Sequence, residues 1–262
     1  MTLELLVSAM NVSAKELAAK MRIGSDALII NQTDHFGYEE FSRLEKYNIK
    51  CYSFKECGVG LSRNNALLRA EHDISLFSDA DIVYADGYEE LVLKEFEKNP
   101  QADMILFNVD VCEERRTYHI EEYGRVRQHN CGRYPAYSIA VRTKRIQAAG
   151  VTFSLRCGGG APYSAGEDSL FLRECLSAGL KIFRAPVTIG REEAEGRSTW
   201  FSGYHDKFFF DRGVLYHFLY GRLAKPLSVR FLLAHKGLMC RDITVREAYR
   251  LMCGGIREAK DL

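Results

Sequence analysis

Short apolar runs alternate with helix-like segments through the first half of the chain, and this alternation limits the fold more than any other feature. Strands are predicted at 3–8, 26–31, 49–54, 74–78 and 103–109. Helices are predicted between them at 13–21, 38–47, 63–71 and 88–98, with Ser62 as the expected cap of the third. Strands that alternate with helices need crossover connections. The pattern therefore predicts an α/β fold with a mainly parallel sheet and helices on both faces.

A parallel sheet also predicts where a ligand binds. In such sheets ligands lie beyond the carboxyl ends of the strands. The loops after Ser8, Asn31, Phe54 and Ser78 should therefore share one rim.

The second half of the chain is less regular. Residues 111–133 are charged and polar. The later elements are predicted as a strand at 136–141, a glycine-rich loop at 157–166, a helix at 168–177 and a strand at 181–185.

Composition limits the class of protein. With 47% apolar and 27% charged residues the chain resembles an ordinary soluble globular protein. A net charge of +1 argues against nucleic-acid binding, which needs a basic excess. The eight cysteines form no CxxC pair and no zinc-site spacing, and no apolar run reaches the roughly 20 residues of a membrane span. We expect reduced thiols in a cytoplasmic protein.

The triplet Asp79-Ala80-Asp81 directly follows the apolar strand at 74–78. Side chains alternate along extended backbone, so the two carboxylates can point the same way and share one hard cation. Such a cation can bridge the phosphates of a nucleotide-sugar and stabilise the charge on the leaving diphosphate. The alternative is a solvated pair of turn aspartates.

A second acidic pair, Glu167-Asp168, lies between the glycine-rich loop and a helix. An acidic residue at this position can cap the helix by accepting from its free backbone amides. It can also be a general base that takes a proton from an acceptor hydroxyl, with the flexible loop admitting the acceptor. Both interpretations remain open from the residues alone.

Between the third and fourth strands lies the segment from Gly58 to Asn65. Its glycines, Gly60 among them, let the backbone approach a ligand, and Arg63 at a helix start could reach a phosphate. The alternative is an ordinary turn before a helix.

Together these motifs resemble the inverting glycosyltransferases of family 2, which have the GT-A fold of nucleotide-diphospho-sugar transferases. In that family a segment like Gly60-Leu61-Ser62-Arg63-Asn64-Asn65-Ala66 precedes the strand that carries the acid-x-acid (DxD) motif. A Glu-Asp pair opens a later helix, as Glu167-Asp168 would here. The match covers the chain from about Leu3 to Gly203.

The resemblance implies that Asp81 binds Mg²⁺ or Mn²⁺ and that Asp79 contacts the ribose or the metal. It implies that Asp168 is the base of an in-line displacement inverting the anomeric carbon, with Glu167 orienting the acceptor. It implies a catalytic domain at 1–200, divided into a nucleotide-sugar-binding half at 1–110 and an acceptor-binding half at 111–200, followed by a basic and aromatic extension at 201–262.

The chain differs from the family at two loops of the donor site. The usual Pro-Thr-Tyr-Asn-like turn is replaced by Ser8-Ala9-Met10-Asn11, and a common acidic residue by Asn31-Gln32. UDP is the expected carrier nucleotide. The candidate donor-binding residues are Ser8, Met10, Asn11, Asn31, Gln32, Gly60, Arg63, Asn64, Asp79, Ala80, Asp81 and Trp200.

Two residues near the end of the match are further candidates. Family members often add a metal or diphosphate contact after the last core strand, frequently a histidine, and His205 has the best position for it. A lone histidine beside aromatic residues is also a common structural feature. Trp200, the only tryptophan, can stack on a sugar or fill the core.

The last segment is rich in aromatic and basic residues, and Lys and Arg outnumber Asp and Glu by eleven to six over 201–262. These residues can form helices that cover the catalytic domain, or a peripheral surface that meets anionic lipids. The aromatic and apolar candidates are Phe208, Phe209, Phe210, Leu215, Tyr216 and Phe218.

The resemblance thus implies a metal-assisted enzyme that moves a sugar from a nucleotide-sugar to a hydroxyl of a glycan or lipid-linked acceptor, in surface polysaccharide or glycoconjugate biosynthesis. A sugar-phosphate nucleotidyltransferase would need a basic glycine-rich loop after the first strand, which Met10-Asn11-Val12-Ser13 does not offer. A non-catalytic sugar-binding or nucleotide-binding protein on the same fold remains the other alternative.

Overall fold

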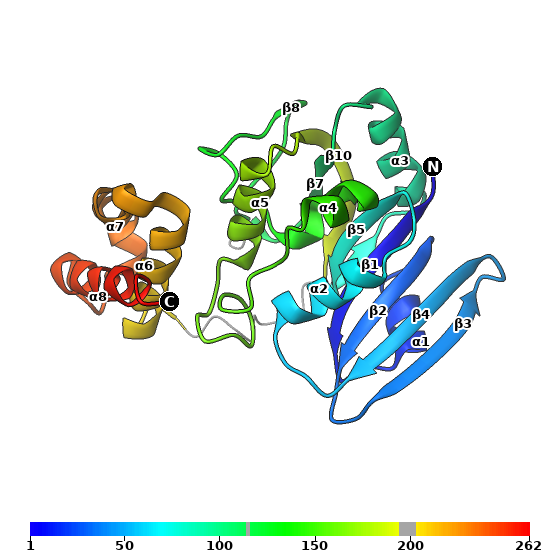
Figure 1. The fold of residues 1–262 in the computed structure, drawn as a ribbon, viewed down its shortest axis with the longest axis horizontal. Coiled ribbons are helices and arrows are strands. Elements are labelled where there is room, and N and C mark those ends of the chain that lie inside the picture. Colours follow the sequence, from blue (N-terminus) through cyan, green and yellow to red (C-terminus); the bar gives the residue numbers. More distant parts are fainter. Residues whose placement is uncertain (114–115, 194–202) are drawn as a thin grey trace.

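The computed structural model describes residues 1–113, 116–193 and 203–262 (Figure 1). Ten strands of these residues form one sheet. In sheet order they are β3 (Gly37–Arg43), β4 (Tyr47–Phe54), β2 (Asp26–Gln32), β1 (Leu3–Met10), β5 (Ile74–Asp79), β9 (Ile139–Arg142), β7 (Met104–Asp110), β10 (Ile182–Glu192) and β6 (Ile82–Tyr84), with β8 (Gly124–Arg125) beside β10.

Most strands of the sheet run in one direction, namely β4, β2, β1, β5, β7 and β10, whereas β3, β9, β6 and β8 run antiparallel to their neighbours. The carboxyl ends of β1, β2 and β5 therefore meet at one edge, with Ser8 beside Asp79 and Met10 beside Gln32. The expected common rim of these strands is confirmed.

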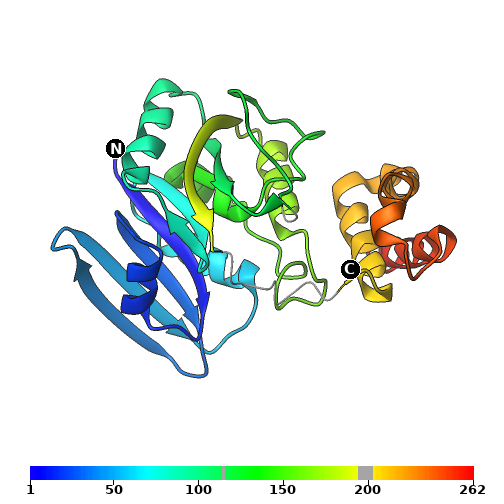
Figure 2. The same ribbon diagram turned by 180° about the vertical axis from the view of Figure 1, so that it is seen from behind.

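Helices cover both faces of the sheet (Figures 1 and 2). One face carries α1 (Ala14–Lys20) and α3 (Tyr88–Lys98), and the other carries α2 (Val59–Arg69), α4 (Thr143–Ala149) and α5 (Glu167–Ser177). Strand β1 is buried on both sides, because successive side chains point to opposite faces of the sheet. Leu5 lies in the apolar core under α1 and α3, and Leu6 lies in the core under α2, α4 and α5. The predicted α/β fold class is confirmed.

The predicted helix at 38–47 is wrong. Its first part belongs to the edge strand β3, which pairs antiparallel with β4 over its whole length, and residues 44–46 form the turn between the two strands. The residues of β3 are mostly exposed, and the rings of Tyr38 and Tyr52 lie 4.8 Å apart across the pair. Cross-strand pairing outweighs the helical propensity of the Glu-rich segment.

The helix predicted from residue 63 begins earlier, at Val59, with Gly58 at its N-cap. Ser62 is consequently buried inside α2, and its hydroxyl donates to Ser8 Oγ at 3.0 Å instead of capping the helix. The strand predicted at 136–141 begins only at Ile139, after a single 3-10 turn.

The last three helices, α6 (Asp206–Tyr220), α7 (Ala224–Met239) and α8 (Val245–Glu258), lie to one side of the sheet and pack against one another (Figure 1). Phe209 and Leu215 are buried, and Phe208 and Tyr216 are partly buried. Phe208, Phe209 and Tyr216 pack among the three helices themselves, and Phe218 is at the surface. Packing of the extension on the catalytic domain and contact with lipids both stay predictions.

The predicted boundary at residue 200 falls outside the described residues and stays a prediction. None of the helices in the described part of the chain has the length and apolar character that crossing a membrane requires.

Candidate active site

Arg63 is the centre of the candidate active site, because its guanidinium joins the two acidic motifs. Nη2 donates to Asp79 Oδ1 at 2.8 Å. Nη1 donates to Asp168 Oδ1 at 2.8 Å and to Glu167 Oε1 at 3.1 Å. A residue of α2 thus connects the end of β5 with the start of α5.

Arg63 is buried, with 4% of its side chain exposed. Burial alone disfavours the charged form, but the three carboxylates outweigh it and raise the pKa of Arg63. The ring centroid of Phe153 lies 5.3 Å from Cζ, and Nε has no hydrogen-bond partner among the described residues. The guanidinium faces carboxylates, and its expected phosphate contact stays a prediction.

The acid-x-acid triplet lies at the rim. Asp79 ends β5 with 32% of its side chain exposed, and Ala80 packs against the core on the α1 side. Asp81 is half-buried, and its backbone carbonyl accepts from Glu193 N at 2.8 Å. Asp79 therefore presents a carboxylate that is held by Arg63 on one side and open to solvent on the other.

The carboxylates of Asp79 and Asp81 suit a hard divalent cation, because Mg²⁺ and Mn²⁺ prefer oxygen ligands. Among the described residues, no group of three or more His, Cys, Asp or Glu side chains could hold a metal ion. Mg²⁺ often takes only one or two protein carboxylates, with waters and substrate phosphates as its other ligands. The two aspartates fit that arrangement. The exposed His205, which precedes α6, is not grouped with them, and its role as a ligand stays a prediction.

Glu167 and Asp168 form the first turn of α5, after Gly166 at the N-cap. No side chain caps this helix, so the cap alternative does not describe the pair. Both carboxylates bind Arg63 instead. Gly158 of the preceding loop lies against Glu167, since a Cβ there would be 2.8 Å from Glu167 Cδ.

The environment of Asp168 favours its protonated form. Burial and the adjacent Glu167 raise the pKa of Asp168 to about 8, although Arg63 acts in the opposite direction. A carboxyl with such a pKa takes and releases protons near neutral pH, as a general base must.

Two predicted donor-binding residues of α2 have packing contacts within the chain. A Cβ at Gly60 would lie 2.3 Å from the carbonyl oxygen of Ser154. Asn64 exchanges two hydrogen bonds with the backbone of Phe153, at 2.9 and 2.7 Å. The start of α2 is thereby fixed to the segment that holds Phe153 over Arg63.

The other predicted donor-binding residues lie at the carboxyl ends of β1 and β2 or directly after β1. The side-chain amide of Asn31 forms two hydrogen bonds with the backbone of Val12, at 3.0 and 3.3 Å. The side-chain amide of Gln32 forms two with the backbone of Gly58, at 3.0 and 3.2 Å. Asn11 has φ of 51° and donates its backbone N–H to Gln32 O, and Met10 is 44% exposed. These contacts shape the rim, and nucleotide binding by these residues stays a prediction. Trp200 lies outside the described residues.

Sequence reasoning missed Tyr137, which precedes β9. Burial raises the pKa of its phenol, as do the nearby carboxylates of Asp79 and Asp168. The phenol therefore lies near the acidic site. The apolar run around it indicated a strand and gave no sign of this position.

Comparison with known proteins supports the resemblance. Residues 38–164 match the family described as Glycosyl transferase family 2. No curated protein matches the sequence. Among solved structures, S. aureus TarS 1-349 in complex with UDP-GlcNAc has a TM-score of 0.64 at 15% identity, over 99% of this chain and 81% of that chain. S. aureus TarS 1-349 alone has a TM-score of 0.63 at 13% identity, again over 99% of this chain and 81% of that chain. A longer S. aureus TarS chain has a TM-score of 0.62 at 14% identity, over 99% of this chain and 49% of that chain.

Proposed function

Because residues 38–164 match the family described as Glycosyl transferase family 2, we propose that this protein moves a sugar from a nucleotide diphosphate to a hydroxyl group with inversion at the anomeric carbon. The observation that carries the proposal is Arg63, which joins the rim carboxylate Asp79 to the Glu167–Asp168 pair. The donor side and the acceptor side of the reaction thus lie within reach of one guanidinium.

Each acidic residue has a separate part in the proposed reaction. Asp168 accepts the proton of the acceptor hydroxyl as the oxygen attacks the anomeric carbon, and Glu167 orients the acceptor. Asp79 and Asp81 hold Mg²⁺ or Mn²⁺ at the rim. The cation stabilises the negative charge on the leaving diphosphate when it is bound.

The donor is proposed to be a UDP-sugar. A similar fold in a TarS structure that contains UDP-GlcNAc supports this choice of probe. The acceptor is proposed to be a glycan or a lipid-linked glycan in surface polysaccharide or glycoconjugate biosynthesis.

The donor assignment is tested with a panel of nucleotide-sugars in the presence of Mn²⁺, measured as released nucleoside diphosphate. We expect release of UDP from a UDP-sugar, and loss of metal-dependent UDP binding in Asp81→Ala, because one of the two carboxylate ligands is removed. Asp86→Ala, which changes an exposed aspartate beyond β6, is the matched control. Metal-dependent binding that persists in Asp81→Ala would overturn the metal assignment. Absence of nucleotide binding in the unmodified chain would favour a non-catalytic protein.

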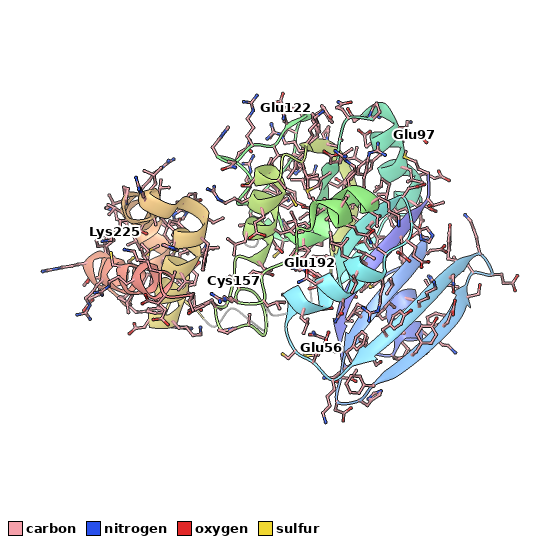
Figure 3. All side chains as sticks on the ribbon, in the orientation of Figure 1. Glu56, Glu97, Glu122, Cys157, Glu192 and Lys225 are labelled. Carbon is pink, nitrogen blue, oxygen red and sulfur yellow. The ribbon has the colours of Figure 1, made fainter. Side chains whose placement is uncertain are left out.

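We also propose that helix α7 meets an anionic lipid surface. Its outer side exposes Val229 (39%) and Leu233 (56%), and Leu223 just before it is 62% exposed. Residues three or four positions apart share a helix face. Exposed cations accompany this apolar strip, namely Arg222, Lys225, Arg230 and Lys236, and Figure 3 labels Lys225 on this helix. Apolar and basic side chains on one face suit an anionic membrane surface.

Vesicle binding tests the proposed lipid surface. The protein should sediment with vesicles of mixed phosphatidylglycerol and phosphatidylcholine and not with vesicles of phosphatidylcholine alone. Sedimentation should decrease when about 0.5 M salt is added, because salt screens the charges. Leu233→Glu should weaken sedimentation, whereas Leu68→Glu, at a 77% exposed position on α2, should not. Equal binding by both variants would contradict the proposal.

A further inference from the structure

Helix α6 contacts the loop that leads to the Glu167–Asp168 pair. Asp211 is 4% exposed, and its Oδ2 accepts from the backbone N of Ser164 at 2.9 Å and from Lys207 Nζ at 2.7 Å. Lys207 Nζ also donates to the carbonyl of Pro162 at 2.8 Å. A buried carboxylate and its lysine partner thus hold two points of the loop from one helix.

A second contact lies at the end of the same loop. Gly166, the N-cap of α5, has φ of +112°, and a Cβ there would lie 2.4 Å from Leu215 Cδ1. Leu215 is buried with Cys157, Leu170 and Leu219 in one apolar cluster. The cluster joins α6 to both the start of the loop, where Figure 3 labels Cys157, and α5 itself.

The other side of the loop touches the donor half of the site. Val59 N, at the start of α2, donates to Gly159 O at 2.9 Å. A Cβ at Gly160 would lie 2.8 Å from Cys57 Sγ. The loop is therefore fixed between α2, which carries Arg63, and α6.

Such a loop needs contacts of this kind to stay in one conformation. The segment from Cys157 to Gly166 contains Gly158, Gly159, Gly160 and Gly166, and glycine loses more conformational freedom on ordering than any other residue. Backbone hydrogen bonds inside the loop, between Gly158 and Tyr163 (2.8 Å) and from Tyr163 N to Arg156 O (3.0 Å), close its turn but do not fix where the turn lies. The position of the loop, and with it the direction in which α5 presents the acidic pair, depends on the elements on either side.

From these contacts we infer that Asp211 and Leu215 are positioning residues, through which the C-terminal helices hold the acidic pair in its reactive geometry. The inference rests on the proposed function of Asp168 as the base. Asp211 and Leu215 act on the loop and on α5, and the nucleotide half of the rim keeps its own contacts to β1, β2 and β5. Loss of the Asp211 contacts should therefore affect turnover and leave nucleotide affinity unchanged.

The test compares Asp211→Ala, Asp211→Asn and Leu215→Ala with Phe218→Ala, which changes a surface residue of the same helix. With UDP-GlcNAc as the probe, release of UDP should fall by about 10- to 100-fold in Asp211→Ala, since displacement of a reacting group by about 1 Å can cost that much. Asp211→Asn keeps an oxygen acceptor for Ser164 N, so the release of UDP should fall less in this variant. The Kd for UDP should stay within about twofold in all variants, because the contacts of the rim are retained.

Hydrogen exchange gives a readout independent of turnover. Amides of residues 156–166 should exchange faster in Asp211→Ala than in the unmodified protein, while those of β1 and β5 stay the same. Unchanged exchange in the loop, or equal losses of UDP affinity and turnover, would overturn the inference. Normal turnover in Asp168→Asn would instead show that Asp168 is not the base. Failure of the proposed function is therefore distinguishable from failure of this inference.

Discussion

Asp168→Asn should lower turnover by about 10²- to 10⁴-fold, the usual contribution of a general base. The amide has the shape of the carboxyl and keeps an oxygen that can accept from Arg63 at the position of Asp168 Oδ1. It cannot take the proton of an acceptor hydroxyl. The measurement is UDP release from UDP-GlcNAc with saturating Mn²⁺, together with the Kd for UDP, which should change little.

Glu174→Gln is the matched control for this variant, because Glu174 is an exposed carboxylate on the same helix. It should keep normal turnover. A rate in Asp168→Asn equal to that of the control would mean that another group is the base.

The pH dependence of turnover should follow from the same residue. The base acts in its deprotonated form, and the pKa of Asp168 is raised to about 8 by burial and by Glu167. Turnover in the unmodified protein should therefore rise with pH up to about 8, and the residual rate of Asp168→Asn should lack this rise. A flat profile across this range would contradict the assignment.

Arg63→Met should lower the free energy of unfolding by about 3 kcal/mol, near the lower end for a broken buried ion pair, because it leaves three partly buried carboxylates without their cation. The side chain is 4% exposed and has contacts below 3.2 Å to Asp79, Glu167 and Asp168. Burial and Glu167 already raise the pKa of Asp168, and Arg63 acts against this rise, so without the guanidinium the folded-state pKa of Asp168 rises further above its unfolded value. Stability is then lost as pH rises above the unfolded pKa, and the loss should be larger at pH 8 than at pH 5.

Urea unfolding of Arg63→Met at these two pH values measures the effect. Arg69→Met lies on the same helix, where Arg69 contacts the rings of Tyr52 and Phe54. It should cost about 1 kcal/mol or less, independently of pH. A similar small and pH-independent loss in Arg63→Met would show that the carboxylates do not depend on Arg63.

The fold was largely predictable because its central elements follow local rules. Helix α3 has the predicted bounds, and β1 and β5 are apolar runs whose alternating sides both need burial. The segment Gly37–Arg43 was not predictable as a strand, since its pairing with β4 depends on a partner and not on its own pattern.

The candidate site was predictable as separate motifs and not as an arrangement. The pair Asp79 and Asp81 was recognisable in the sequence because it comes directly after an apolar strand. The pair Glu167 and Asp168 was recognisable because it opens a helix after a glycine-rich loop. The role of Arg63 depends on residues that lie 16, 104 and 105 positions away in sequence. The contacts of Asp211 to the loop likewise need the tertiary structure, because the tail alone indicated only aromatic and basic character.

The crossing of α6 and α8 leaves no space between the two helices. A Cβ at Gly213 would lie 2.1 Å from Met252 O, and one at Gly255 would lie 2.0 Å from Phe210 O. An added methyl group at either position must therefore push α6 away from α8. Since α6 also holds the loop before the acidic pair, laboratory evolution aimed at a new acceptor should include α8, a helix that a search confined to the rim would omit.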